Sequence, residues 1–504
     1  MLDAGITLEP ERAELVAKLA KTPLENWSKK DLAAYKGGMT AGTKGLPMKL
    51  VYGSDFPYQG AAEHLGTYFE NVGLLPSLAQ GGLSNVWGAA MLPYADRDIS
   101  DWPLKIESLA PHYAAALELT GLAGTTDALA KFFPLYSQKA VELRPSEQAR
   151  QLLNKMERNK EQLSAVGVYF GRSRVAVQGN SSNSHEGCVY CRLCMYGCPY
   201  GYIYSSSQSL VSFQKNPQFK YQGNAIVVSV RELGDHVEIS GYDRNTRQPL
   251  SWTCQRAFLA AGAIPTTRIL LKSLDAYNQQ VYLKDSQYFL LPMMLMKRVK
   301  DATREGLHTL SQLFLEIIDA DENQRVAHLQ IYTQSDLIND ALSGALGPIG
   351  KVFPPLLRNL QDRMLVTQGF LHSDFSPRIA LKLSKARETD RFEIVGEENP
   401  AARGHVKKIV RKLVRHSRRI GAIPIPIMLK MAEPGRSFHS GGSFPMTRDP
   451  RGFQSDLQGV LPGWKRVHAV DATVLPSVPA TTITLSVMAN AHRIASEVTR
   501  ASGN

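Results

Sequence analysis

Three stretches near the C-terminal end of the chain decide its fold. They are FHSGGS at residues 438–443, HAVDATVLP at residues 468–476 and PATTIT at residues 479–484. The first sets a histidine beside glycines, which let a backbone approach a ligand closely. The second reads as a strand that ends in an aspartate, and the third as a small-residue segment that opens a helix. Together they predict the closing part of a ligand site in an α/β protein.

This block closely resembles the C-terminal end of the glucose–methanol–choline (GMC) oxidoreductases. The resemblance extends over nearly the whole chain. It is specific in the C-terminal block, moderate over residues 80–113 and 257–272, and weak over 286–430. It implies an α/β fold with an FAD-binding, Rossmann-like three-layer domain and a second substrate domain built on an antiparallel sheet. The expected domains are an FAD-binding domain at 1–285, a substrate-binding domain at 286–430, and a return to the FAD-binding domain at 431–504.

Alternation of apolar and polar residues predicts strands in both parts. Residues 225–230 and 236–240 alternate in this way, and residues 257–265 read as a buried strand that enters a tight turn before a helix at 266–272. Further strands are expected at 313–318, 327–332 and 367–371. An apolar stretch with prolines, residues 337–357, is expected to fold over a pocket as a lid, with a membrane-touching or partner-binding flap as the alternative.

Composition narrows the class of protein. The chain has 504 residues, of which 43% are hydrophobic and 21% charged, as in a globular protein. No apolar run reaches the roughly 18 residues of a membrane-spanning helix, and the N-terminus does not look like a signal peptide. Four of the five cysteines crowd one segment, which favours a reducing compartment and a cytoplasmic location. The net charge of +12 leaves peripheral contact with an anionic membrane as an alternative.

A basic amphipathic helix is expected at residues 403–420, where eight Lys and Arg residues alternate with apolar residues at helical spacing. No aromatic residues interleave with these charges, so nucleic-acid binding is not expected. A solvated helix face is the favoured interpretation, and contact with an anionic substrate or lipid head group is the second.

The N-terminal residues resemble the end of the second strand of a dinucleotide-binding unit. There an acidic residue accepts hydrogen bonds from both ribose hydroxyls, and Asp3 fits this role. No G-x-G-x-x-G fingerprint precedes Asp3. We therefore expect that the first strand and the phosphate-binding helix of the family, roughly 25–30 residues, are lacking.

The resemblance assigns further cofactor contacts. Residues 81–88 resemble the glycine–serine–asparagine loop that lies against the flavin ring in the family, and residues 257–265 resemble a turn that touches the dinucleotide. The expected FAD-binding residues are Asp3, Gly82, Ser84, Asn85, Trp87, Gly88, Ile226, Gly262, Asp471 and Thr482. From the residues alone, Asp471 is equally interpretable as a helix cap.

His439 is the expected catalytic base. A neutral imidazole accepts a proton near pH 7, and in the family the matching histidine takes the hydroxyl proton while the flavin takes the hydride. A second polar residue, His or Asn, stands just before the proline of the closing segment in the family. Here that position is Val478, whose side chain neither donates nor accepts a hydrogen bond. Thr481 or Thr482 is expected to take over, or His439 acts alone.

A cysteine run lies in the middle of the chain. Cys188, Cys191, Cys194 and Cys198-Pro199 reproduce the spacing of the bacterial ferredoxin run. In two-cluster ferredoxins the fourth cysteine serves the other cluster, and no second run exists here, so a single cluster would take Cys198 or Cys254 as its fourth ligand. The pattern predicts one iron–sulfur cluster, with disulfides, zinc or free thiols as alternatives.

The sequence thus predicts an FAD-dependent oxidoreductase that oxidises a CH–OH group of a small alcohol or sugar. An iron–sulfur cluster would make a dehydrogenase with a separate electron acceptor the better interpretation than an oxidase. Two rival hypotheses remain. One is a truncated, non-catalytic or partner-dependent homologue, favoured by the missing fingerprint and Val478. The other is an iron–sulfur electron-transfer subunit, in which His439 would have no role.

Overall fold

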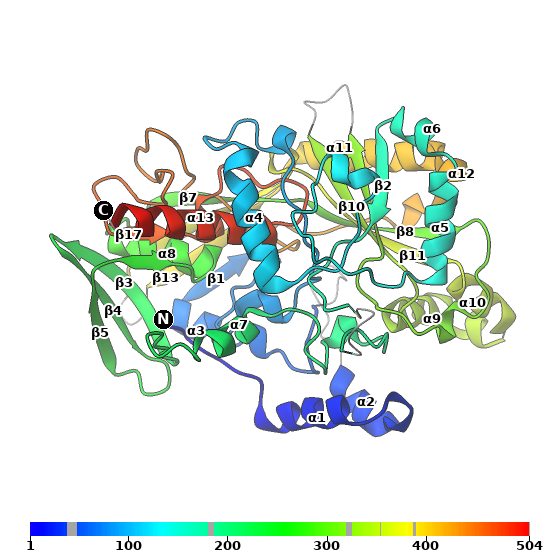
Figure 1. Cartoon of the computed structure of the whole chain (residues 1–504), viewed down its shortest axis with the longest axis horizontal. Helices are drawn as coiled ribbons and strands as arrows, with labels where there is room; N and C mark the ends of the chain where they lie inside the picture. Colours follow the sequence, from blue (N-terminus) through cyan, green and yellow to red (C-terminus); the bar gives the residue numbers. More distant parts are fainter. Residues whose placement is uncertain (38–47, 180–185, 319–324, 353, 387–389, 503–504) are drawn as a thin grey trace.

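A computed structural model describes residues 1–37, 48–179, 186–318, 325–352, 354–386 and 390–502. Figure 1 shows a mixed α/β molecule in which the N- and C-terminal segments lie in the same half, and the strands β8, β10 and β11 lie in the other. Helices pack against the sheets on both halves. The predicted fold class is confirmed: α/β layers are combined with antiparallel sheets.

The half that contains both termini carries the parallel strands. β6 (Ala257–Leu259) and β17 (Val467–Ala469) form a two-stranded parallel pair, flanked by α8 (Ala263–Ser273) and α13 (Thr484–Ser502). A parallel bridge joins Leu2 to Gln222. In the described part of the chain β6 pairs only with β17. A second parallel bridge joins Ile6 to Ala79, so the parallel pairings of these segments are short and separate among the described residues.

Three antiparallel strands extend from this half. They are β3 (Ala225–Leu233), β4 (His236–Asp243) and β5 (Pro249–Cys254), joined in that order. The strands predicted at 225–230 and 236–240 are confirmed. The helix predicted after the turn at residue 262 is α8. Gly262 directly precedes its first residue and has a φ of 96°, which glycine adopts readily because it lacks a Cβ.

Two larger sheets hold most of the remaining strands. A five-stranded sheet has the order β1-β13-β12-β7-β16, and a second sheet has the order β14-β8-β11-β10-β9-β2 with β15 paired to β8. The strands of the first are β1 (Thr67–Glu70), β7 (Gln280–Asp285), β12 (Arg378–Ser384), β13 (Arg391–Glu397) and β16 (Ser440–Gly441). Those of the second are β2 (Val168–Arg172), β8 (Tyr288–Leu295), β9 (Leu313–Ile318), β10 (Val326–Tyr332), β11 (Met364–Phe370), β14 (Ala422–Pro424) and β15 (Lys430–Met431).

Both sheets draw strands from across the expected domain boundaries at residues 285 and 430. β2 belongs to the expected FAD-binding segment but forms an edge of the substrate-side sheet with β9. Conversely, β12 and β13 belong to the expected substrate-binding segment but pair with β7 and β1. Two large apolar cores follow this division, one around α8, α13 and the five-stranded sheet, the other around the second sheet.

Helices cover the sheets, and two pairs of them lie at the outside of the molecule. Apart from α8 and α13, the helices are α1 (Pro10–Lys21), α2 (Lys29–Lys36), α3 (Ala61–Leu65), α4 (Ile106–Thr120), α5 (Glu147–Glu157), α6 (Lys160–Ser164), α7 (Ser206–Phe213), α9 (Asp336–Val352), α10 (Pro354–Gln361), α11 (Pro400–Arg415) and α12 (Ser417–Ile420). Figure 1 shows the two outer pairs as α1 with α2 and α9 with α10. α9 continues through Pro348 as far as Val352.

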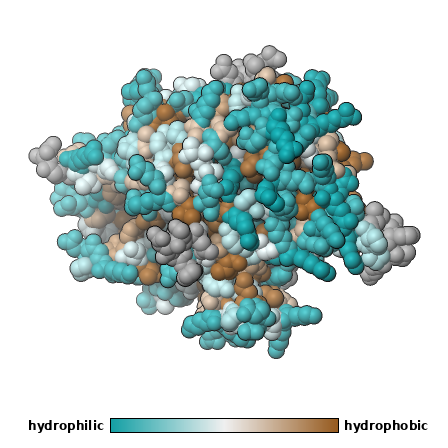
Figure 2. Space-filling model, turned by 45° about the vertical axis from the view of Figure 1, so that its right-hand side comes forward, coloured by the Kyte–Doolittle hydropathy of each residue, from teal (hydrophilic) through white to brown (hydrophobic). Residues whose placement is uncertain are grey.

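The basic helix predicted at 403–420 is confirmed as α11 and α12. Val406 and Leu413 are fully buried against the second sheet, whereas Val414 is exposed, and the charged residues cover the outer face. Figure 2 shows one face of the molecule as mostly hydrophilic, with scattered hydrophobic areas. In the described residues no helix combines the length and apolar character needed to cross a bilayer.

Candidate active site

His439 lies in a loop, residues 435–440, that Asp285 at the end of β7 holds in place. The Asp285 carboxylate accepts hydrogen bonds from the Gly435 N–H at 2.7 Å, the Ser437 hydroxyl at 3.1 Å and the Ser440 hydroxyl at 2.8 Å. The Ser286 N–H donates to the His439 carbonyl at 3.2 Å. The sequence analysis did not single out Asp285. Its place at the end of an alternating strand was the only available signal.

The backbone just before His439 is strained. Phe438 has a φ of 59°, in the left-handed region that a bulky residue seldom takes. Its ring contacts the Tyr58 ring, with centroids 6.4 Å apart, and lies under the Arg436 guanidinium at 5.8 Å. Strain of this kind persists only where the surroundings fix it, and it marks functional loops more often than ordinary ones.

The His439 side chain is half-buried and its imidazole is neutral. Burial and the nearby His328 together lower its pKa to about 3. Its Nδ1 atom is buried and has no hydrogen-bond partner in the described part of the chain. A buried nitrogen without a partner costs free energy unless a ligand meets it. The imidazole can therefore form a hydrogen bond with a hydroxyl group of a ligand.

A row of buried polar side chains lies on the sheet beside His439. Phe370 at the end of β11 contacts both histidines, with ring centroids 5.0 Å from His439 and 6.0 Å from His328. The row, called the polar ladder below, consists of Glu316 on β9 and of His328, Gln330 and Tyr332 on β10.

Hydrogen bonds run along the polar ladder in one direction. The Tyr332 hydroxyl donates to Gln330 Oε1 at 3.0 Å, the Gln330 amide donates to His328 Nε2 at 3.2 Å, and His328 Nδ1 lies 2.7 Å from Glu316. Residues 328, 330 and 332 share one face because side chains alternate along a strand. Glu316 is fully buried, and burial raises its pKa. The sequence analysis missed these residues, because an alternating strand reads the same whichever face is polar.

Thr481 and Thr482 lie just before the N-terminus of α13. Both side chains are buried, and neither hydroxyl has a hydrogen-bond partner among the described residues. The N-terminus of a helix carries partial positive charge and free N–H groups, which favour a polar or anionic ligand. Two unpartnered hydroxyls at such a position fit a ligand with hydrogen-bonding atoms.

Val478 is fully buried and bound through its backbone. Its N–H donates to the Ser373 hydroxyl at 3.1 Å, and its carbonyl accepts from the Ser373 N–H at 2.8 Å. The segment thus carries no polar side chain at this position, as its sequence implies. The neighbouring Ser477 hydroxyl accepts a hydrogen bond from the Trp102 indole at 2.6 Å.

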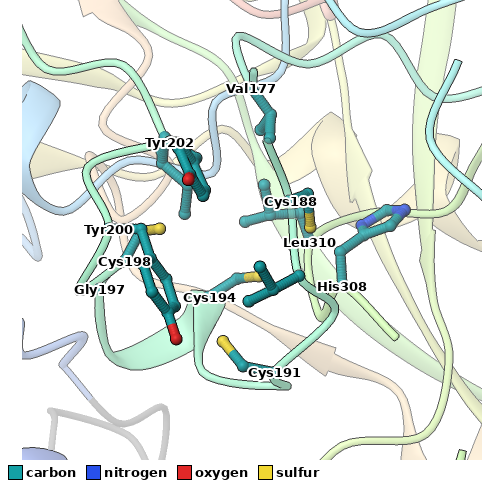
Figure 3. Close-up of a pocket in the computed structure, with 12 residues that line it drawn as sticks. Val177, Cys188, Cys191, Cys194, Gly197, Cys198, Tyr200, Tyr202, His308 and Leu310 are labelled. Atoms are coloured by element: carbon teal, nitrogen blue, oxygen red, sulfur yellow. The ribbon is translucent and has the colours of Figure 1, made fainter. Parts of the chain in front are cut away.

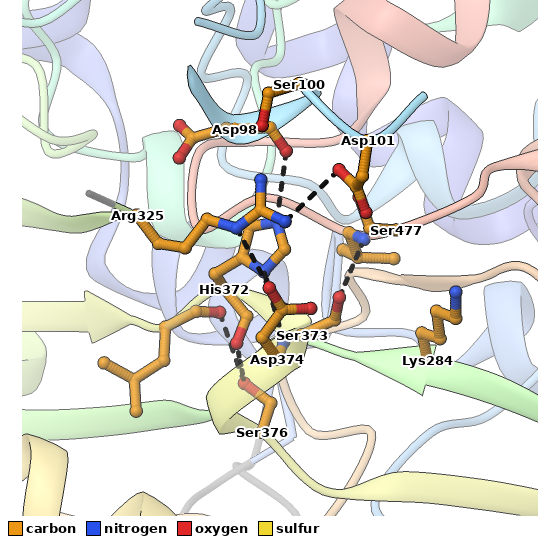
Figure 4. A network of polar contacts seen from close by, with 12 residues as sticks. Asp98, Ser100, Asp101, Lys284, Arg325, His372, Ser373, Asp374, Ser376 and Ser477 are labelled. Carbon is orange, nitrogen blue, oxygen red and sulfur yellow. Dashed lines mark hydrogen bonds and ion pairs between the residues drawn. The ribbon is translucent and has the colours of Figure 1, made fainter. Parts of the chain in front are cut away.

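The turn that holds Val478 is itself fixed by a polar network (Figure 4). His372 Nε2 lies 3.2 Å from the Asp98 carbonyl, and its Nδ1 accepts from the Asp374 N–H at 3.1 Å. Arg325 lies between Asp101, at 3.2 Å, and Asp374, at 2.9 Å. The His372 side chain, whose Nδ1 lies 3.3 Å from the Asp374 carboxylate, and the charge of Arg325 lower the pKa of Asp374 to about 2. None of these residues stood out in the sequence, because their partners lie far away along the chain.

The glycine loop at 81–88 lies beside the polar ladder. A Cβ at Gly88 would stand 3.5 Å from the Tyr332 hydroxyl, in ordinary van der Waals contact, so this loop packs directly against the ladder. Ser84 donates to the Gly81 carbonyl and contacts the Ser205 and Ser206 hydroxyls at 3.2 and 3.1 Å. Gly82, at a left-handed φ of 55°, has open space where a Cβ would stand.

Two other side chains of this loop bond to the protein. The Asn85 amide donates to the carbonyls of Gln80 and Gly82 at 3.0 and 2.8 Å, and the Trp87 indole donates to the Tyr204 carbonyl at 2.8 Å. These bonds fix the shape of the loop.

Asp471 ties the end of β17 to the turn before α8. Its Oδ2 accepts from the Gly262 N–H at 2.9 Å and the Thr266 hydroxyl at 2.5 Å, and its Oδ1 accepts from the Thr473 N–H and hydroxyl at 3.0 and 2.8 Å. Four protein donors occupy the lone pairs of this carboxylate. Asp471 caps the short helix at Ala472–Val474, as its alternative interpretation held, and positions Gly262.

The two remaining expected cofactor residues differ in their surroundings. Asp3 is partly exposed, and its carboxylate accepts from the Tyr221 hydroxyl at 3.0 Å, which itself accepts from Gln80 at 3.1 Å. Asp3 thus connects to the start of the glycine loop. Ile226 is a buried residue of β3, packed in a cluster with Ala4 and Val86. Its side chain is part of the protein core.

FAD is the ligand that the sequence analysis expects, and polar atoms without protein partners are available for it. The Nδ1 atom of His439 and the hydroxyls of Thr481 and Thr482 have no partner in the described residues, and a Cβ at Gly82 would meet no atom within 4 Å. Asp3, the residue expected at the ribose, has a partly exposed carboxylate. The described residues include no glycine-rich turn between a parallel strand and a helix N-terminus that would cradle the pyrophosphate.

The four cysteines of the run line one cavity (Figure 3). Tyr200 and Tyr202 lie on one side of it, and His308 and Leu310 on the other. All five cysteines are free thiols, and Cys254 lies elsewhere, on β5. Among the described residues no three His, Cys, Asp or Glu side chains converge closely enough to hold a single metal ion.

Comparison with known proteins gives a likeness of fold. No protein-family model matches the chain, and no curated protein matches its sequence. The solved structure of pyridoxine 4-oxidase from Mesorbium loti is similar, with a TM-score of 0.57 over 99% of this chain and 94% of that chain. Sequence identity is 13%, so the likeness concerns the fold.

Proposed function

We propose that this chain is an FAD-dependent oxidoreductase of the GMC type that oxidises a CH–OH group. The observation that carries the proposal is the His439 imidazole, whose Nδ1 has no partner in the described residues and whose pKa of about 3 keeps it neutral. A neutral imidazole nitrogen without a protein partner can accept a hydrogen bond from a substrate hydroxyl, which is the geometry that general-base catalysis requires.

Different residues would contact the flavin, accept the proton and contact the substrate. FAD supplies the hydride acceptor when bound. Thr481, Thr482 and the start of α13 would hold the polar edge of the flavin ring, and the glycine loop at 81–88 would lie against it. His439 would accept the hydroxyl proton. The polar ladder offers an amide and a phenol next to that position, which suits a substrate with further hydroxyl groups, such as a sugar.

The electron acceptor belongs to the same proposal. Pyridoxine 4-oxidase is by its name an oxidase, whereas we propose a dehydrogenase for this chain. The support is the cavity lined by four cysteines. Oxidation of an alcohol by a flavin does not itself require cysteine side chains.

Flavin binding and substrate reduction test the proposal together. Protein purified without oxygen is titrated with FAD, and alcohols and sugars are then added while the flavin absorbance is followed. We expect a bound flavin that bleaches with at least one of them. A bound flavin that never bleaches over a broad panel would favour the non-catalytic homologue. Failure to bind FAD would contradict the proposal.

Thr482→Val separates ligand contact from folding. Valine keeps the shape of threonine and removes a buried hydroxyl that has no protein partner. We expect FAD-free protein to gain about 1 kcal/mol in unfolding free energy, and FAD affinity to fall about tenfold. Urea unfolding and FAD titration measure the two effects.

Thr473→Val is the matched control. Its hydroxyl donates to Asp471 at 2.8 Å, so this variant should lose about 1.5 kcal/mol of unfolding free energy. If both variants destabilise the FAD-free protein equally, the Thr482 hydroxyl has a protein role and is not a cofactor contact.

A further inference from the structure

We propose that Cys188, Cys191, Cys194 and Cys198 together bind one [4Fe–4S] cluster. The four thiols line one cavity, whereas Cys254 on β5 packs against the main apolar core and does not line it. Cys198, and not Cys254, is therefore the proposed fourth ligand. The proposal deepens the dehydrogenase assignment, on which its role in turnover rests.

The cavity is shaped by a tight chain path. Tyr190 and Arg192 take left-handed φ values of 57° and 69°, and Gly197 has a φ of 105° with the Tyr52 ring 2.4 Å from where a Cβ would stand. Such turns bring cysteines three residues apart to face one centre. The lining residues other than the thiols are mostly apolar or aromatic, as around a buried cluster.

Backbone N–H groups point at the sulfurs. The Thr309 N–H lies 3.4 Å from Cys194 Sγ. Cys188 and Cys191 each receive a backbone N–H, from Tyr190 and Leu193. Cys198 receives three, from the backbone of Tyr200, Tyr202 and Ile203. Neutral thiols gain little from such donors, whereas thiolates that bind iron are stabilised by them, and N–H bonds to sulfur are a main determinant of cluster potential.

A cation completes the surroundings. The Lys49 ammonium is partly buried, donates to the Trp87 carbonyl at 2.8 Å, and has Cys194 as its interacting acidic group. In the described residues no carboxylate pairs with it. A buried cation needs an anion nearby. A cluster held by four thiolates carries net negative charge and supplies one.

A mononuclear metal and a disulfide fit less well. Zinc needs its four sulfurs about 2.3 Å from one point, and no such convergence occurs among the described residues. All four thiols are free. A cubane separates its ligands, because each cysteine binds a different iron. Four sulfurs spread around a cavity match that arrangement (Figure 3).

The cluster would connect the flavin site to an outside acceptor. Lys49 donates a hydrogen bond to the Trp87 carbonyl and interacts electrostatically with Cys194 of the cavity. Tyr204, whose carbonyl accepts from the Trp87 indole, is two residues from Tyr202 in the cavity wall. Oxidation of one CH–OH group to a carbonyl releases two electrons and two protons. A cluster passes single electrons, so two molecules of a one-electron acceptor, such as ferricyanide, are reduced per substrate, and both protons go to solvent.

The test uses the full chain produced with added iron and purified without oxygen. Iron and acid-labile sulfide are counted per chain, and the dithionite-reduced protein is examined by electron paramagnetic resonance. We expect about four of each per chain and a signal of a reduced cluster. Zinc in place of iron, or no iron after chemical reconstitution, would overturn the proposal. Neither result depends on substrate turnover. The cluster proposal is therefore tested independently of the proposal that the chain oxidises an alcohol.

Alanine variants identify the ligands. Cys188→Ala and Cys198→Ala should lose the four-iron content, while Cys254→Ala, the matched control on β5, should keep it. Circular dichroism and bound FAD report whether each variant folds. Loss of iron in Cys254→Ala, or four irons retained in Cys198→Ala, would overturn the ligand set. If a pocket variant does not fold, the iron and sulfide content of the unaltered chain still decides the cluster.

Discussion

Replacement of His439 by alanine is expected to lower the rate at which an alcohol reduces the bound flavin by about 10²–10⁴-fold, the usual contribution of a positioned base. The flavin should remain bound, because its other contacts come from Thr481, Thr482 and the glycine loop. Anaerobic stopped-flow absorbance measures the reduction rate directly and avoids the question of the electron acceptor.

The pH dependence follows from the lowered pKa of His439, about 3. The imidazole stays neutral at every pH well above this value, so its ionisation should not change the rate of flavin reduction between about pH 5 and 8. The unfolded chain has the ordinary histidine pKa of 6.5 and binds the proton first as the pH falls. Folding stability from this group is thus complete above about 6.5 and declines as the pH falls toward 3.

His236→Ala is the matched control, since this histidine is partly exposed on β4 and belongs to the three-stranded sheet away from His439. It should reduce flavin at the unaltered rate. A His439→Ala variant that also kept that rate would exclude His439 as the base and leave the electron-transfer subunit as the better hypothesis.

Gly459→Ala is expected to have the largest effect on stability. This glycine has a φ of 73°, and a Cβ there would stand 1.9 Å from the Ala469 carbonyl oxygen, a backbone atom that cannot move aside. Ala469 ends β17 two residues before Asp471, and its N–H donates to the Gly459 carbonyl at 2.9 Å. We expect a loss of about 3 kcal/mol in unfolding free energy, from the left-handed conformation and the clash together.

Gly463→Ala isolates the two contributions. Gly463 has a φ of 86° but nothing within 4 Å of its Cβ position, so alanine there meets only the conformational cost, about 1 kcal/mol. Urea unfolding of both variants measures the difference. Equal losses would mean that the contact with Ala469 relaxes without cost.

The secondary structure around His439 could be predicted because its signals are local. His439, Asp471 and the start of α13 each lie in a short stretch whose glycines, strand end and helix start are visible in sequence. The strands β3, β4, β9 and β10 were likewise predicted from runs of strand-forming residues, although β9 and β10 are buried on both faces. The cysteine run is local in the same way. Its four cysteines lie within eleven consecutive residues and line one cavity.

The rest depends on contacts between distant segments. Asp285 and the His439 loop are some 150 residues apart, and the polar ladder becomes a ladder only because β9 and β10 pair with their polar faces inward. The sequence analysis considered only that the Val478 side chain lacks a hydrogen-bonding group. It could not show that the Val478 backbone bonds to Ser373, which lies over 100 residues away along the chain. No periodicity within a segment contains that information.

The passage of strands across the expected domain limits has a consequence for how such a protein can change. β2, at Val168–Arg172, closes one edge of the sheet whose other strands come after residue 286. A segment that begins after residue 286 could not be exchanged between relatives by a single crossover, because the transplanted piece would arrive without that edge. Under the proposed function, new substrate specificities would instead arise by point changes within the sheet, at positions such as Gln330 and Tyr332.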